Sequence, residues 1–207
     1  MTLSIRSFAA VSIAALSVSA FAIDGSWTTG GQTTGTGPWN MTSTDSTFSV
    51  LRFVLDPGQG ITFGDLTNIS YTYDSNLGGI AGGAPRTAVV FTDNTQLLVH
   101  WGPAGTFVDP TLGDGLNTGN ILMMTDNGRY DLGGVGGSVY TDYTAALALA
   151  GTKEVSRISL IVDSFGGHDR DFDIHGFDVQ AVPEPATMTV LGAGALALLR
   201  RRRAKKA

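Results

Sequence analysis

The chain has 207 residues, a net charge of −5 and no cysteine. Without cysteine it has neither a disulfide framework nor a lipoprotein anchor, so a hydrophobic core, with or without a metal ion, must hold the fold. Once the two terminal segments described below are set aside, residues 23–181 contain 6 basic and 17 acidic residues, a net charge of −11. Such an acidic segment argues against nucleic acid and anionic phospholipid as partners.

The first 22 residues have the pattern of a secretory signal peptide. Arg6 gives a short positive region, and Phe8–Val18 is apolar. Ala20 and Ala22 are the small residues of a small-x-small cleavage site around Phe21. We therefore expect residues 1–22 to direct export and to be removed.

Residues 23–181 are long enough to form one domain with a sizeable core. Aspartate far outnumbers glutamate in this segment, and Asp favours turns whereas Glu favours helices. Short runs rich in β-branched and aromatic residues predict strands at 48–55, 61–63, 69–73, 87–92, 96–101, 120–125, 156–165 and 172–182. Several short strands joined by Gly, Asn and Asp turns predict an all-β fold, an antiparallel β-sandwich or jelly roll.

Turn residues and composition refine this prediction. Residues 93–95 (Asp-Asn-Thr) and 126–128 (Asp-Asn-Gly) predict tight hairpin turns. Residues 23–47, rich in Gly, Thr and Ser, are expected to begin loosely before the first full strand. Trp27 and Trp39 in that segment indicate that parts of it lie against the sheets.

The segment Thr141–Ala150 breaks the strand pattern because it is rich in alanine, and it predicts a short helix. Thr141 is the N-cap candidate, Asp142 lies in the first turn, and Gly151 marks the end. We expect the helix to pack across one end of the sandwich through Ala145, Leu149, and Tyr143 or Ala146.

The residues usual in catalysis are scarce. Residues 23–181 hold one glutamate, Glu154, and three histidines, His100, His168 and His175. There is no Gly-x-Ser-x-Gly elbow and no His-Glu-x-x-His zinc motif. We therefore expect a protein without enzymatic activity. An enzyme acting on polysaccharide would need a pair of carboxylates that only the fold could bring together.

The densest polar segment is residues 163–175, which suggests a metal site. Asp169, Asp171 and Asp173 would project to one side of an extended strand, and Asp163 precedes them. Hard oxygen ligands of this kind suit Ca²⁺, although the order is not that of an EF-hand. A solvated acidic loop, or neutralisation by Arg170, is the alternative. A transition-metal site with His168 and His175 is a further interpretation.

Four residues are candidates for glycan contact. Tyr71 and Tyr73 share one face of a predicted strand, and Trp101 ends another, so their rings would suit stacking on sugars. Arg86 would suit a carboxylated sugar, because a guanidinium binds carboxylate through two parallel hydrogen bonds. The alternatives are core packing of the rings, since Ile69 shares the face of the tyrosines, and pairing of Arg86 with an aspartate.

The C-terminal residues 182–207 contain three units in order. Val182, Pro183, Glu184 and Pro185 form a Pro-Glu-Pro segment that cannot continue a helix or strand. Residues 186–199 form an uncharged run that would be about 21 Å long as a helix. Because this length is less than the ~30 Å thickness of the membrane core, the run predicts a marginal or transient contact with the inner membrane. Arg200, Arg201, Arg202 and Arg203 follow, and such a cluster stays on the cytoplasmic side.

This arrangement resembles the PEP-CTERM sorting signal of Gram-negative bacteria. The resemblance implies recognition by an exosortase, removal of the tail, and delivery to the cell surface or an exopolysaccharide matrix. The segment Ser156–Val182 also resembles the last two strands of jelly-roll surface domains that carry this signal. Asp163 fits that pattern, whereas His175 stands where the pattern has an aspartate of a structural calcium site.

The sequence therefore predicts an exported surface or extracellular-matrix protein with a structural or adhesive role. The alternative is a carbohydrate-binding module of jelly-roll type with a calcium site. The third possibility is the enzyme acting on polysaccharide described above.

Overall fold

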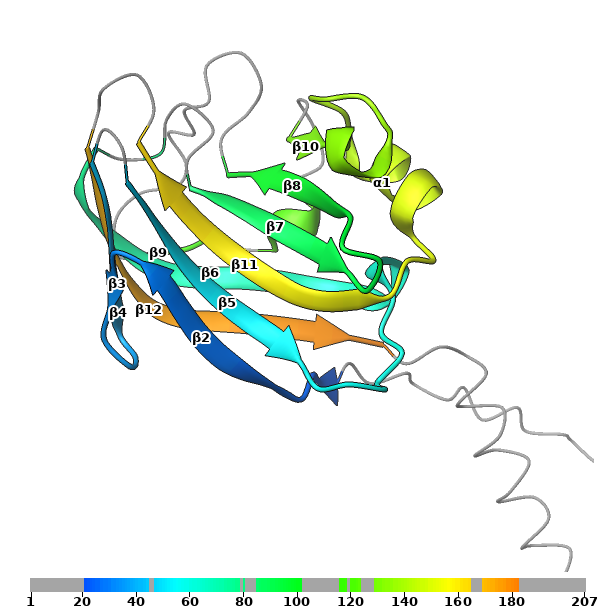
Figure 1. Ribbon diagram of the computed structural model, residues 1–207, viewed down its shortest axis with the longest axis horizontal. Coiled ribbons are helices and arrows are strands. Elements are labelled where there is room, and N and C mark those ends of the chain that lie inside the picture. Colours follow the sequence, from blue (N-terminus) through cyan, green and yellow to red (C-terminus); the bar gives the residue numbers. More distant parts are fainter. Residues whose placement is uncertain are drawn as a thin grey trace, which may run out of the picture.

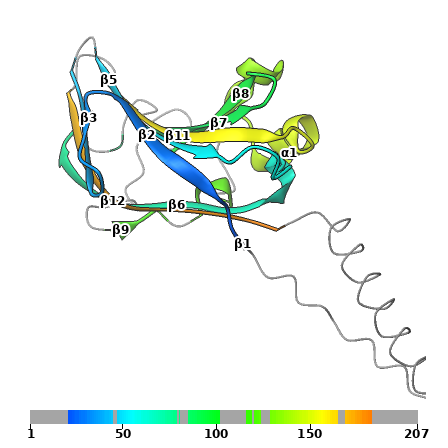
Figure 2. The ribbon, with the colours of Figure 1, turned by 60° about the horizontal axis from the view of Figure 1, so that its bottom comes forward.

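The computed structural model describes residues 21–44, 47–78, 80, 85–101, 116–118, 120–123, 129–164 and 169–182. These residues form two antiparallel β-sheets that pack face to face, with one α-helix at one end (Figures 1 and 2). The prediction of an antiparallel β-sandwich with one short helix is confirmed. No helix among the described residues is long and apolar enough to cross a membrane.

Sheet A has the strand order β3-β4-β12-β6-β9, and β1 pairs with the other end of β12. Its strands are β1 (Phe21–Ala22), β3 (Thr33–Thr34), β4 (Trp39–Ser43), β6 (Leu66–Leu77), β9 (Leu116–Asn117) and β12 (Arg170–Ala181). The pair β6 and β12 forms its centre, in a register that runs from Leu77 opposite Asp171 to Leu66 opposite Ala181.

Sheet B has the strand order β10-β8-β7-β11-β5-β2. Its strands are β2 (Gly25–Gly31), β5 (Phe48–Leu55), β7 (Arg86–Phe91), β8 (Gln96–His100), β10 (Tyr130–Asp131) and β11 (Val155–Asp163). The predicted hairpin at residues 93–95 joins β7 and β8. Asn94 there has a φ of 64°, and the Asp93 carboxylate accepts a hydrogen bond from the Thr95 amide at 2.9 Å, as such turns require.

The chain crosses repeatedly between the two sheets. It leaves sheet A after β1, enters sheet B as β2, and returns as β3 and β4. The last two strands also lie in different sheets, β11 in sheet B and β12 in sheet A. Because β1 pairs with β12 through Phe21 opposite Ala181, the two ends of the described domain lie side by side (Figure 2).

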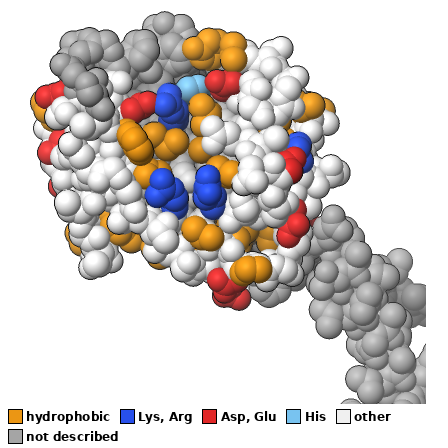
Figure 3. Space-filling view, in the orientation of Figure 1, with side chains coloured by type: hydrophobic (Ala, Val, Ile, Leu, Met, Phe, Trp, Pro, Cys, Tyr) orange, Lys and Arg blue, Asp and Glu red, His pale blue; other side chains and the backbone are white. Residues whose placement is uncertain are grey.

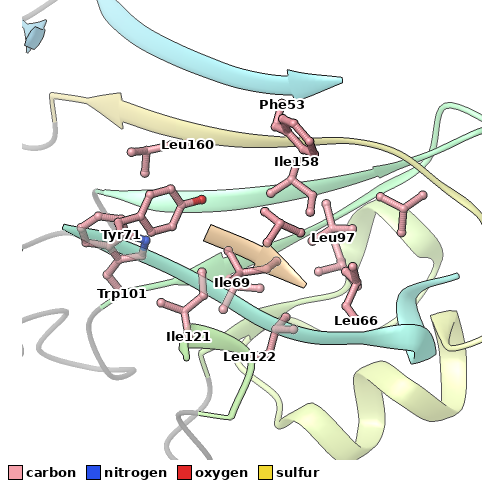
Figure 4. Close-up of a cluster of buried hydrophobic side chains, with 14 of the residues drawn as sticks. Phe53, Leu66, Ile69, Tyr71, Leu97, Trp101, Ile121, Leu122, Ile158 and Leu160 are labelled. Atoms are coloured by element: carbon pink, nitrogen blue, oxygen red, sulfur yellow. The ribbon is translucent and has the colours of Figure 1, made fainter. Parts of the chain in front are cut away.

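The core lies between the sheets and follows the alternation of the strands. Ile158, Leu160 and Val162 alternate along β11 and are 0–1% exposed, so they share the face of the strand that points into the core. Figure 4 shows side chains of the two sheets meeting in the core, with Tyr71 and Trp101 packed beneath Leu160. Every residue of the hydrophobic core lies between Ile23 and Ala181, so this part of the chain contains the whole described core.

Two predicted strands are instead single turns of 3₁₀ helix, η1 (Phe63–Asp65) and η2 (Ile121–Met123). At η1 the Asp65 carboxylate accepts hydrogen bonds from the Thr62 amide at 2.8 Å and hydroxyl at 2.6 Å, which stabilises a turn over a strand. At η2 the Asn120 side chain accepts from the Leu122 amide at 3.2 Å. A third turn, η3 (Gly133–Val135), lies in the glycine-rich stretch after β10.

Residues 23–47 are more regular than predicted, because they contain β2, β3 and β4. Their glycines and threonines hide the strand pattern, since few side chains there are apolar. Trp27 and Trp39 do lie against the sheets, as predicted. The predicted turn at residues 126–128 lies outside the described residues.

The helix α1 (Tyr143–Ala150) is capped one residue later than predicted. Asp142, not Thr141, is the N-cap, because its carboxylate accepts a hydrogen bond from the Ala145 amide at 2.8 Å. Ala146 and Ala150 are its buried residues, and Gly151 ends it as predicted. Leu149 is 42% exposed, so the prediction that it packs on the sandwich is wrong.

Candidate functional site

The three aromatic residues predicted to contact glycan lie in the core. Tyr71 and Trp101 are 0% exposed and Tyr73 is 1% exposed. Their rings pack on one another, with centroids 5.0 Å apart for Tyr71 and Trp101 and 5.2 Å apart for Tyr73 and Trp101. These rings cannot stack on a ligand at the surface, so the predicted platform is not formed. Ile69 on the same face is 0% exposed too, which shows that this face of β6 points inward.

A buried threonine satisfies the polar atoms of this aromatic cluster. The Tyr71 hydroxyl lies 3.1 Å from Thr87 Oγ1, and the Trp101 indole N–H donates to the same oxygen at 3.3 Å. Burial raises the pKa of Tyr71 well above its ordinary value, so its hydroxyl stays protonated. The cluster is therefore structural.

Asp171 and Asp173 project from the outer face of β12, as the alternation predicted. The Asn40 side-chain amide donates to both carboxylates, at 2.7 Å and 2.9 Å. The Asn76 amide donates to both as well, at 3.4 Å to Asp171 and 2.8 Å to Asp173. Amide donors from the two neighbouring strands thus hold the like charges side by side.

This carboxylate and amide network favours the charged form of Asp173. The hydrogen bonds from Asn76 and Asn40 hold the pKa of Asp173 below its ordinary value, and the nearby His175 adds to the effect. The His175 ring in turn lies 2.9 Å from Asp74 of β6. The result is an exposed row of fixed anions and amides across sheet A.

The four predicted metal ligands do not come together. Asp163 ends β11 in sheet B, whereas Asp171 and Asp173 lie in sheet A and Asp169 precedes β12. Within the described ranges, no group of three or more His, Asp or Glu side chains is placed to hold a metal ion. His168 lies outside the described residues. Calcium binding stays an untested prediction.

Arg86 is engaged by an acidic partner. Its guanidinium forms an ion pair with the Asp163 carboxylate, and the two side chains are 29% and 25% exposed. The alternative use predicted for Arg86, pairing with an aspartate, is the one that the structure shows.

Sequence reasoning missed a cleft at the open edge of the sandwich, here called the Trp27 cleft. Trp27 of β2 lies opposite Phe53 in register and reaches across to sheet A, where its ring centroid is 5.1 Å from that of Trp39 and 4.7 Å from that of Phe177. Trp27 is nevertheless 38% exposed. The residues that line the cleft are Ile23, Trp27, Phe53, Phe177, Asp178 and Val179.

The cleft exists because strand pairing is interrupted there. Along one side of β12, β4 pairs with residues 170–174 and β1 pairs with residues 180 and 181. None of the described strands pairs with residues 175–179 on that side, and β2 is the last described strand of sheet B. Aromatic side chains from both sheets fill the gap. The one signal in the sequence was a tryptophan standing alone in a segment of glycine and threonine.

A polar group borders the cleft. The Asp178 carboxylate accepts hydrogen bonds from the Asn68 amide at 2.7 Å and the Gln180 amide at 2.8 Å. These bonds hold the carboxylate on the outer face of sheet A, because Asp178 and Phe177 project to opposite sides of β12. The side chains that surround the cleft are therefore mainly aromatic and apolar.

A backbone hydrogen bond holds the C-terminal end of the described domain in place. The Val182 amide donates to the Asp65 carbonyl at 2.9 Å, which fixes the last described residue to η1. The predicted sorting residues Pro183, Glu184, Pro185 and Arg200–Arg203 lie outside the described residues, as does Ala20. Ala22 belongs to β1, so cleavage after it would remove that strand.

Comparison with known families defines this protein as one that is sorted after export. Residues 181–203 match the family model of the PEP-CTERM protein-sorting motif, which confirms the predicted resemblance. The chain therefore carries a signal that implies export, processing of the C-terminal tail by an exosortase, and a destination at the cell surface or outside the cell. Neither the curated proteins nor the solved structures give a match to the chain.

Proposed function

We propose that this chain is a non-enzymatic structural and adhesive protein of the cell surface or extracellular matrix, and that its sandwich domain holds extracellular polysaccharide in the Trp27 cleft. The observation that carries the proposal is the partly exposed Trp27 ring at an open edge of the core. The sorting motif supports a destination where polysaccharide is the abundant ligand.

The chemistry of the cleft suits a sugar. One face of a sugar ring is lined by C–H groups and packs on an aromatic ring, whereas its hydroxyl groups need polar partners. Trp27 supplies the ring, backed by Trp39, Phe53 and Phe177 so that it is held in place.

The carboxylates support a role without catalysis. A glycosidase needs one carboxylic acid that stays protonated near neutral pH beside a second that is ionised. Asp171 and Asp173, neighbouring carboxylates on β12, share the same two amide donors, and the pKa of Asp173 is lowered rather than raised. Asp173 is therefore held as an anion and does not supply the protonated acid.

The fluorescence of the full chain tests the proposal, because Trp27 is partly exposed and Trp101 is buried. The chain is kept in a polyoxyethylene detergent, which has no sugar head group, and titrated with the neutral polysaccharide of the producing cell. We expect a blue shift of tryptophan emission that saturates, and its loss in Trp27→Phe. Phe48→Ala, which removes an exposed ring from another surface, is the matched control.

Two arms of the same experiment test the rest of the proposal. Incubation should release no new reducing ends from the polysaccharide, and their release would show an enzyme instead. Repeating the titration with a chelator tests the calcium prediction. An unchanged shift in Trp27→Phe, or no binding by the wild type, would contradict the role of the cleft.

A further inference from the structure

The outer face of sheet B carries an unusual group of arginines. Arg52 of β5, Arg86 of β7 and Arg157 of β11 all project from it, and they are half of the six basic residues between positions 23 and 181. Figure 3 shows basic side chains gathered among hydrophobic ones over this face. We call it the arginine face. It is distinct from the Trp27 cleft, because Trp27 and Thr28 project to opposite sides of β2 and Thr28 lies opposite Arg52.

The register places two of these arginines close together. Arg52 lies opposite Ser159, and Arg157, two residues earlier in the same strand, lies opposite Val54. Arg52 and Arg157 are therefore diagonal neighbours on one face, about 7–8 Å apart at their backbones. Arg52 also extends over β2, since a Cβ added at Gly30 would lie 2.8 Å from its Nη1.

The floor between the arginines is apolar. Val50, Ala88 and Val90 point outward yet are only 1–4% exposed, so the arginine side chains and Gln96 lie across them. Together they line a shallow hollow that also includes Ile161 and, at its border, Phe48. Phe48 is 51% exposed and offers a ring at the end of the hollow.

Two of the three arginines on this face have no partner among the residues that the structure describes. Among the described residues, neither Arg52 nor Arg157 forms an ion pair or hydrogen bond. The strands of sheet B contain two acidic residues: Asp163 is paired with Arg86, and Asp131 accepts from the Gly133 amide at 2.8 Å. Two neighbouring cations thus have no described partner, in a segment whose net charge is −11.

We propose that the arginine face binds an anionic polysaccharide, through carboxylate or sulfate groups that Arg52 and Arg157 hold together. A guanidinium binds either group through two parallel hydrogen bonds, and two guanidiniums on adjacent strands suit successive anions of a linear polymer. The apolar floor and the Phe48 ring suit the C–H faces of the sugar rings. This ligand differs from that of the Trp27 cleft, so the two proposals stand or fall separately.

A second copy of the chain is the other candidate occupant, since sheet A presents acidic residues. Its carboxylates are already engaged, however. Asp171 and Asp173 accept from Asn40 and Asn76, and Asp74 lies against His175. A polymer brings free anions, so charge complementarity favours polysaccharide.

The test compares binding of the full chain, in the same sugar-free detergent, to immobilised polygalacturonate, dextran sulfate and dextran. We expect saturable binding to polygalacturonate at about 50 mM salt and much weaker binding at about 300 mM, since screening shortens the range of the charges. Arg52→Gln with Arg157→Gln should weaken binding by about tenfold or more, through lost charge-assisted hydrogen bonds. The dextran sulfate arm separates sulfate from carboxylate as the preferred group.

The matched control is Thr152→Glu with Lys153→Gln, which changes the net charge equally but away from the face, and it should bind within about twofold of the wild type. Arg52→Lys with Arg157→Lys keeps the charge and should restore part of the binding. Melting curves check that each variant folds. If a double variant fails to fold, Arg157→Gln alone, at an exposed position, should still weaken binding severalfold.

Three results would overturn the proposal. The first is no binding of the wild type to either polyanion at low salt. The second is equal binding by the double glutamine variant and the wild type. The third is salt-sensitive self-association that the same variant abolishes without any polyanion binding, which would assign the face to a second copy. Trp27→Phe should leave polygalacturonate binding unchanged, so failure here is distinguishable from failure of the cleft.

Discussion

Thr87 has a large part in the core for so small a side chain. It is 0% exposed, and its hydroxyl oxygen is the partner of both the Tyr71 hydroxyl and the Trp101 indole N–H. Two of the largest buried rings therefore depend on one oxygen for their polar atoms. The sequence predicted the strand in which Thr87 lies, but not this bond, because Tyr71 and Trp101 come from other strands.

Replacing Thr87 by Val keeps the volume and removes the oxygen. We expect a loss of about 2–3 kcal/mol in the free energy of unfolding, since a buried hydroxyl and a buried indole N–H would lose their partner. Urea unfolding of Thr87→Val against the wild type measures it. The exposed Thr152→Val is the control, and a loss as small as that of the control would contradict the role given to Thr87.

Asp173 makes the stability of the domain depend on pH in acid. Its pKa is lower in the folded chain than in the unfolded one, because Asn76 and Asn40 donate to the carboxylate. Its contribution is therefore fully present above the unfolded pKa of about 3.9 and is lost as pH falls through the lower folded value. We expect Asp173→Asn to cost about 1 kcal/mol at neutral pH, and the difference from wild type to shrink as the pH falls below the unfolded pKa of about 3.9. A difference that stays the same in melting experiments at both pH values would contradict this account.

Strands with a clear alternation of apolar and polar residues were predictable from the sequence, whereas turns held by side-chain hydrogen bonds were not. The strand predicted at 48–55 is β5 with the same bounds, and that predicted at 156–165 is β11 within two residues. The turns η1 and η2 replaced predicted strands because the Asp65 side chain accepts from the Thr62 amide and the Asn120 side chain accepts from the Leu122 amide. The short strand β2 escaped prediction because its exposed edge position needs few apolar residues.

The start of α1 gives a direct test of which residue caps it. Asp142→Ala should lower the free energy of unfolding by about 1 kcal/mol, because the Ala145 amide loses its acceptor. Thr141→Ala should cost less, since Thr141 is joined to Tyr130 through backbone groups alone. Thermal melts of the two variants measured together decide the matter. A larger loss for Thr141→Ala would restore the cap expected from the sequence.

At the scale of the whole molecule, the two sheets present opposite charge to their surroundings. The strands of sheet A carry Asp74, Asp171, Asp173 and Asp178 among their exposed or partly exposed residues, whereas sheet B carries the arginine face. The composition showed the net charge but not this separation, because neighbours on a face come from distant parts of the chain. The sorting signal, by contrast, was fully readable, since its three units follow one another in the sequence.

The position of β12 also decides how the domain would bear a mechanical load. Any pull on the C-terminal end enters through this strand, which lies inside sheet A and is bonded to β6 along almost its whole length and to β4 over residues 170–174. The force would run along the strand and strain many backbone hydrogen bonds at once, because they lie across the direction of the pull. A strand at the edge of a sheet, pulled outward, would instead peel away one bond at a time. The tail thus follows a strand that resists shear, so a load on a protein held at the cell surface would meet the domain at its most strongly bonded strand.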